Sequence, residues 1–167
     1  MKTLVYGMQS SGASYITWRL SQDPNTISVL DLFAHASAPA FNLEHKSHDV
    51  IVKCAAVTLY GLDDQIECFA PDRLILVTRK MKDVVQSLST KPYRNYGGLV
   101  SQKCEVFKRE VSKHKADFDE VIAYEDICKI PFVPTRSVGE IVEFNIAHSK
   151  WCAANFNIAW GTGNIHA

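Results

Sequence analysis

The chain has 167 residues, of which 47% are apolar and 22% charged, and it carries 18 basic and 18 acidic side chains. This length predicts one domain, residues 1–167, with a core of its own, and the composition excludes a fibrous or low-complexity chain. The net charge of zero argues against a protein that coats polyanions, so we expect no nucleic acid among its partners. Any anion binding would come from a local site.

Cysteine usage and hydropathy indicate the compartment. The five cysteines lack the CxxC spacing of zinc and redox sites, and they predict reduced, mostly buried thiols in a cytoplasmic protein: Cys54, Cys68, Cys104, Cys128 and Cys152. Only four or five apolar residues precede Gly7, and no later run approaches the length of a bilayer span. We therefore expect neither a signal peptide nor a membrane partner.

Strands and helices alternate along the sequence. Strand-like segments rich in β-branched residues lie at residues 3–6, 27–30, 50–54, 74–78 and 120–123, and helix-like segments at 14–21, 58–69, 83–89, 99–115 and 138–155. This alternation predicts an α/β fold with three layers (α/β/α) and a central, mostly parallel sheet. Right-handed crossovers then place ligand loops at the carboxyl ends of the strands.

Two segments interrupt this pattern. Residues 34–48 (AHASAPAFNLEHKSH) contain small residues, a proline and three histidines, and they predict a long loop on the side of an active site. Residues 91–98 (KPYRNYGG) predict a second loop that is basic and aromatic. Such a loop is usually solvated, although Lys91 and Arg94 could also contact an anion.

The segment GMQSSGAS, residues 7–14, follows the first strand and precedes a helix. Its outline is that of a phosphate-binding loop, but Ala13 stands where such loops carry lysine. Gly7 and Gly12 permit the turn, and Ser11 and Ser14 add hydroxyl groups. Because free N–H groups and the helix dipole meet at such a turn, the segment predicts an anion site.

A second motif follows the fourth predicted strand. In RLILVTRKMKDVVQSL the strand ends at Arg79, and Ser87 follows eight residues later on a helix. The arginine fork and the serine hydroxyl can converge on one anion. A surface arginine with an incidental helix serine is the alternative.

Both segments resemble those of the sulfotransferases that use 3'-phosphoadenosine 5'-phosphosulfate (PAPS). Members carry a first loop close to PKSGTTW or GxxRSGTT, to which residues 7–15 are similar. Their second element, close to vRNPkDvavS, is matched in register by Arg79, Asp83, Val84, Val85 and Ser87. Weaker matches are AYEDI at residues 123–127, similar to YEDL, and VIVKCA, similar to a strand that ends in Lys-Thr-His. Together these segments span about residues 3–127 in the family's order.

The resemblance implies a P-loop-like fold and a donor site for PAPS or its product, 3'-phosphoadenosine 5'-phosphate (PAP), with no metal. Gly12, Ala13 and Ser14 would cradle the 5'-phosphosulfate, and Arg79 and Ser87 would hold the 3'-phosphate. The full set of nucleotide-binding residues that it implies is Gly7, Gln9, Ser10, Ser11, Gly12, Ala13, Ser14, Arg79 and Ser87.

The sequence departs from the family at the catalytic cation and at the base. Ser10 replaces the loop lysine or arginine, so we expect Lys53, at the end of its strand, to supply the charge; a lysine in solvent is the alternative. The family's histidine two residues later corresponds to Ala55. The base would then come from the region after the second strand, with Asp31 and His35 as catalytic candidates within the set Asp31, His35, Glu44, His45 and His48.

The family's late basic motif, similar to RKGxxGDWK, has no clear counterpart, and Arg136 with Gly139 matches it poorly. The sequence thus favours a sulfotransferase that acts on a hydroxyl or amine of a small molecule or sugar. Two alternatives remain: a P-loop phosphotransferase or kinase with a degenerate loop, and a non-catalytic nucleotide-binding protein of sulfotransferase-like fold. Because the chain is short for the family, a homodimer could complete the acceptor pocket.

Overall fold

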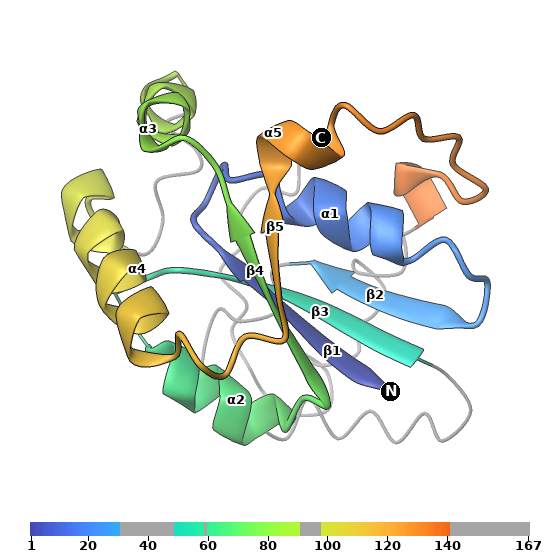
Figure 1. Ribbon diagram of the computed structural model, residues 1–167, viewed down its shortest axis with the longest axis horizontal. Helices are drawn as coiled ribbons and strands as arrows, with labels where there is room; N and C mark the ends of the chain where they lie inside the picture. The colour runs from blue at the N-terminus through green and yellow to red at the C-terminus, as the bar shows by residue number, and fades with distance from the viewer. Residues whose placement is uncertain (31–48, 59, 91–97, 141–167) are drawn as a thin grey trace, which may run out of the picture.

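The computed structural model describes residues 1–30, 49–58, 60–90 and 98–140, which build an α/β fold around a parallel sheet (Figure 1). Its strands are β1 (Lys2–Gly7), β2 (Thr26–Leu30), β3 (Asp49–Ala55), β4 (Arg73–Thr78) and β5 (Glu120–Ala123). All five run parallel in the order β2-β3-β1-β4-β5. The prediction of a parallel sheet is confirmed, and each strand lies within one residue of its predicted bounds.

The sheet is covered on both faces, which explains why its central strands are almost continuously apolar. Leu4 and Tyr6 of β1 belong to one buried cluster, and Val5, between them, belongs to a second cluster on the opposite face. Alternate residues of a strand point to opposite faces, so both sides of β1 need apolar side chains. The core therefore consists of two layers with β1 at their centre.

Helices cover both faces. They are α1 (Ala13–Leu20), α2 (Leu62–Phe69), α3 (Met81–Ser89), α4 (Val100–Lys113) and α5 (Tyr124–Ile127). Residues of α2, α3 and α4 pack on the cluster of Leu4 and Tyr6, whereas residues of α1 and α5 pack on the cluster of Val5. Figure 1 shows α2 and α4 on the opposite side of the sheet from α1, in agreement with a three-layer α/β/α arrangement.

Helix α2 begins later than predicted. The sequence predicts a helix from residue 58, but the structure begins it at Leu62. Gly61 is extended, and its backbone N–H donates to Asp64 Oδ2 over 2.7 Å. The Asp64 carboxylate thus pairs with a backbone N–H that has no partner within the helix. This contact fixes the start of the helix after Gly61.

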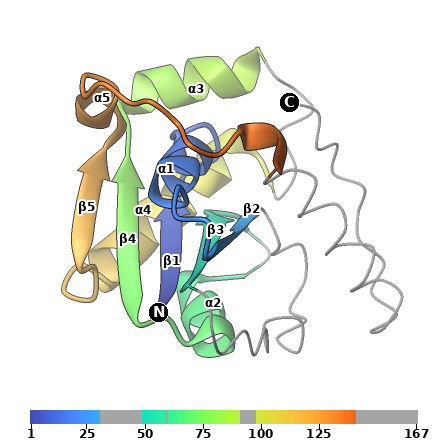
Figure 2. The ribbon, with the colours of Figure 1, turned by 90° about the vertical axis from the view of Figure 1, so that its right-hand side faces the viewer.

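The strands direct their carboxyl ends to one edge of the molecule, where the β1–α1 connection, α3 and α5 lie, while α2 lies toward the other edge (Figure 2). No helix among the described residues combines the length and the apolar character needed to cross a bilayer. Of the four described cysteines only Cys54 is buried, so the expectation of mostly buried thiols is wrong for this part of the chain.

Three predicted segments fall largely outside the described residues. These are the loop 34–48, the loop 91–98 except for Gly98, and the tail 138–155, of which residues 138–140 are described and helical.

Candidate functional site

The β1–α1 loop, residues 8–12, connects the carboxyl end of the central strand to α1 through two residues of positive φ. These are Ser10, with φ of 64°, and Gly12, with φ of 91°. Ser11 N donates to Met8 O over 3.0 Å and closes a turn. A Cβ at Gly12 would lie 2.1 Å from the ring of Tyr124, which is the first residue of α5. Both the backbone and the space therefore require glycine at this position.

The first turn of α1 presents backbone donors at the carboxyl edge of the sheet. Gly12 is the N-cap, and the first helical hydrogen bond runs from Ile16 N to Gly12 O over 3.0 Å. The N–H groups of Ala13, Ser14 and Tyr15 precede this bond, so none of them has a partner within the helix. The first turn contains no acidic residue. Its dipole therefore favours an anion in front of the loop.

Arg79 joins the second motif to this loop. It follows β4, the neighbour of β1 in the sheet, and its Nη1 donates to Ser10 O over 2.9 Å. Its guanidinium carbon also lies 4.8 Å from the ring centroid of Tyr124. The same ring closes over Gly12, so the loop, the arginine and the tyrosine form one contact group. The segment after β4 and the β1–α1 loop are therefore in direct contact through Arg79.

A lysine that the sequence analysis did not single out contacts the loop from α4. Lys103 is fully buried, and its Nζ donates to Gln9 Oε1 over 2.5 Å. Burial lowers the pKa of Lys103. Lys103, Val106 and Glu110 are all buried, with the spacing of one helical face. That spacing was the available signal in the sequence.

Three consecutive loop residues bury polar atoms that have no hydrogen-bond partner among the described residues. These atoms are Gln9 Nε2, Ser10 Oγ and Ser11 Oγ. Buried polar side chains are normally paired, and each unpaired group costs about 1–3 kcal/mol. All three can donate. Together with the first turn of α1, they form a set of donors that a bound anion can satisfy.

Lys53 lies inside the molecule rather than in solvent. It is 5% exposed and stands on β3 in register with Val5 of β1, so the alternative of a solvated strand-end lysine does not apply. The strand continues to Ala55, and Ala56 N donates to Gly7 O over 2.9 Å, which brings the end of β3 beside the start of the loop. Lys53 is therefore a buried lysine two residues before the end of β3, where this strand meets the start of the loop.

Ser87 follows Arg79 in the sequence and lies on α3. Arg79 precedes α3, whereas Ser87 lies on its second turn, about 9 Å along the axis from the first residue of that helix. Among the described residues no hydrogen bond connects Arg79 and Ser87. That the two groups hold one phosphate stays a prediction.

The catalytic candidates Asp31 and His35 lie outside the described residues, as do Glu44, His45, His48, Lys91 and Arg94. Arg136, the poor match to the late basic motif, lies elsewhere. Its Nη1 donates to the carbonyl oxygens of Ser21, Asp23 and Thr26, at the turn between α1 and β2. That turn follows the far end of α1 from the loop, so Arg136 has a structural role there.

Two cavities on the surface of the described residues lie away from the β1–α1 loop, which lines neither of them. One, of about 420 Å³, is apolar and lies between α4 and strands β4 and β5. The other, of about 430 Å³, is rich in carboxylates and lies against α2, the start of β4 and the end of α4.

No protein-family model matches the chain, and no curated protein is similar enough to it to be counted as a relative.

Proposed function

We propose that the chain binds PAPS at the β1–α1 loop and transfers its sulfuryl group to a hydroxyl or amine of a small molecule or sugar. One observation carries the proposal: the hydrogen bond from Arg79 Nη1 to Ser10 O, 2.9 Å long, which connects the two segments that resemble sulfotransferases. Adjacent parallel strands bring the two segments to one edge of the sheet, and this hydrogen bond holds the arginine against the loop.

The donors at the loop are suited to a phosphosulfate. The first turn of α1 offers backbone N–H groups, and Gln9, Ser10 and Ser11 bury donors that have no partner among the described residues. Hydrogen bonds from such donors to charged oxygens are stronger than those to neutral groups. A kinase would in addition need a cation against its terminal phosphate, but Ala13 stands at the lysine position.

Arg79 retains binding capacity in this arrangement. A guanidinium has five N–H donors, and the bond to Ser10 uses one of them. The remaining donors would face the 3'-phosphate, which distinguishes PAPS from ATP. Ser87 would reach the same phosphate only if the phosphate bridged the first turns of α3.

The positive charge for transfer would come from Lys53, Lys103 or both. Each is buried, and Lys103 contacts the loop directly through Gln9. A cation about 4 Å from the developing charge contributes a few kcal/mol at an effective dielectric near 20, which corresponds to about a hundredfold in rate. Asp31 and His35 stay the predicted sources of the base.

Calorimetric titration of the chain with PAP, compared with ATP plus Mg²⁺, tests the proposal. We expect saturable binding of PAP, loss of that binding in Arg79→Ala, and little binding of ATP. Arg73→Ala is the matched control, because Arg73 begins the same strand and pairs with Glu120 at the opposite edge of the sheet.

A preference for ATP with Mg²⁺ would overturn the proposal in favour of a phosphotransferase. Binding of PAP without turnover of PAPS toward a panel of hydroxyl and amine acceptors would favour the non-catalytic alternative. Absence of binding for both nucleotides would refute nucleotide binding at the loop.

A further inference from the structure

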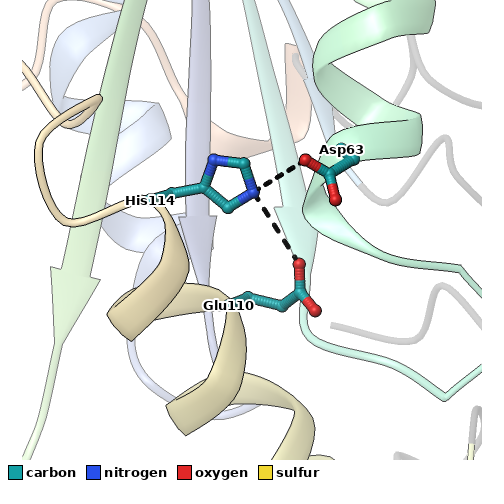
Figure 3. A group of neighbouring side chains, drawn as sticks. All are labelled: Asp63, Glu110 and His114. Atoms are coloured by element: carbon teal, nitrogen blue, oxygen red, sulfur yellow. Dashed lines mark ion pairs between the residues drawn. The ribbon is translucent and has the colours of Figure 1, made fainter.

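Two polar residues lie on the inner face of α4 near its carboxyl end, away from Lys103. Glu110 and His114 are 3% and 6% exposed, and they face Asp63 from the first turn of α2 (Figure 3). His114 Nε2 lies 3.0 Å from Asp63 Oδ1 and 4.0 Å from Glu110 Oε2. One ligand atom from each of the three residues lies within 4.8 Å of the other two.

The histidine is oriented so that its lone pair faces the carboxylates. Its Nδ1 lies 2.9 Å from Asp117 Oδ2, and because a carboxylate only accepts, Nδ1 carries a proton. In a ring with that single proton, Nε2 is an acceptor. It is buried and makes no hydrogen bond within the described residues, although two carboxylates lie beside it. Nε2 and the two carboxylates therefore need a positive charge between them, either a proton on Nε2 or a bound metal ion.

Two basic side chains pair with the carboxylate oxygens that point away from His114. Lys113 donates to Asp63 Oδ2, and Arg109 lies 2.8 Å from Glu110 Oε1, so each carboxylate keeps its other oxygen toward His114. Glu110 Oε2 also accepts from Leu62 N over 3.0 Å. With Asp117 included, three carboxylates face two cations, which leaves one uncompensated negative charge while the histidine is neutral.

We propose that Asp63, Glu110 and His114 bind a divalent transition-metal ion, with Zn²⁺ as the best fit to one imidazole nitrogen and two carboxylate oxygens. Such ligands bind zinc at about 2.0–2.2 Å, and three protein ligands leave a fourth position open. Asp63 and His114 line the cavity of about 430 Å³, so this position would face solvent. Asp117 orients the histidine, as carboxylates do beside metal-bound imidazoles.

The site would connect the start of α2 to the end of α4. It is separate from the β1–α1 loop, and the proposal of a metal site does not depend on the proposed sulfotransferase activity.

Titration of the full, reduced chain with Zn²⁺ by calorimetry, and with Co²⁺ by absorption, tests the site. We expect one ion per chain, with cobalt d–d bands and no thiolate-to-cobalt band, because no cysteine belongs to the group. His114→Gln and Asp63→Asn should abolish binding, and Asp117→Asn should weaken it by about 10–100-fold. Asp119→Asn, which alters an exposed carboxylate of the same cavity, should leave it unchanged.

His114 is buried and its variant can fail to fold, so Asp63→Asn, at a half-exposed side chain, carries the test by itself. Absence of saturable binding in the wild-type chain would overturn the proposal and leave a purely ionic cluster with a protonated histidine. Binding that persists in Asp63→Asn, or that shows thiolate coordination, would also overturn it.

Discussion

Lys103 Nζ and Gln9 Oε1 lie 2.5 Å apart, across 94 residues of sequence, and their contact connects an outer helical layer of the fold to the loop at the edge of the sheet. An aromatic pair next to this contact supports it, because Phe107 of the same helix stacks on Tyr6 of β1 with ring centroids 5.9 Å apart. Helix α4 thus positions its lysine against the loop through an aromatic pair on the central strand.

Because Lys103 is buried, the effect of its replacement on the free energy of unfolding should depend on pH. Because desolvation lowers the pKa of Lys103 below its usual 10.5, the unfolded chain binds an extra proton between the lowered value and 10.5, and stability rises with pH across that window. We expect the free energy of unfolding of the wild-type chain to increase relative to that of Lys103→Met as the pH approaches 10.5. Urea unfolding at neutral and alkaline pH measures this. The exposed Lys108→Met on the same helix should show no such trend, and a pH-independent difference for Lys103→Met would contradict the assignment.

Gly12→Ala should be strongly destabilising. The added Cβ meets the Tyr124 ring at 2.1 Å, and the backbone at φ of 91° disfavours any L side chain. We expect a loss of about 2–4 kcal/mol in the free energy of unfolding, from strain and steric overlap together. Gly139→Ala is the control, because its Cβ would meet nothing nearer than Ser137 Oγ at 3.6 Å. Equal effects of the two substitutions in chemical denaturation would show that the loop is not packed as described.

Ser11→Ala should separate stability from binding. Ser11 Oγ is buried without a hydrogen-bond partner among the described residues, so its removal relieves a desolvated group and should raise the free energy of unfolding by about 1 kcal/mol. The same change should weaken PAP binding about tenfold, because it deletes one donor to a charged ligand. Thermal unfolding and calorimetry on one preparation measure both effects. Exposed Ser14→Ala should change stability by less than about 0.5 kcal/mol, and a loss of stability in Ser11→Ala would mean that the hydroxyl is satisfied in the free protein.

Arg136→Ala should lower the stability of the chain and leave its nucleotide affinity unchanged. Its Nη1 donates to the carbonyl oxygens of Ser21, Asp23 and Thr26, so its loss leaves these acceptors without a charged donor. We expect destabilisation by about 2 kcal/mol with unchanged affinity for PAP. Denaturant unfolding and nucleotide titration of the variant check this. A selective loss of nucleotide affinity would instead place Arg136 in the anion site.

The sheet could be predicted from the sequence because its signals are local. Five β-branched segments separated by helical ones specify parallel strands, and parallel strands end at one edge, which predicts that Arg79 and the β1–α1 loop are neighbours. Ser87 is a different case. It was assigned to the site by its distance in sequence, and its position depends on the length of α3 rather than on the edge of the sheet.

Long-range packing accounts for the features that the sequence did not reveal. The ring of Tyr124 reaches Gly12 only because β5 pairs with β4 in the register Thr78↔Ala123, which places the start of α5 over the loop. Glu110 and His114 have polar side chains of the kind that usually lie in solvent, yet they are buried and face Asp63. Helical spacing gives the face, but only the position of α2 shows what that face meets.

The central position of β1 has a consequence for synthesis of the chain. This strand emerges from the ribosome before its partners β3 and β4, and the loop after it acquires the Tyr124 ring only when β5 has been translated. An apolar segment is therefore exposed while the following strands are made, and cotranslational folding is delayed until β5, the last strand among the described residues, has been translated. Nascent chains that end before Glu120 should remain sensitive to protease and depend on chaperones that shield unpaired strands.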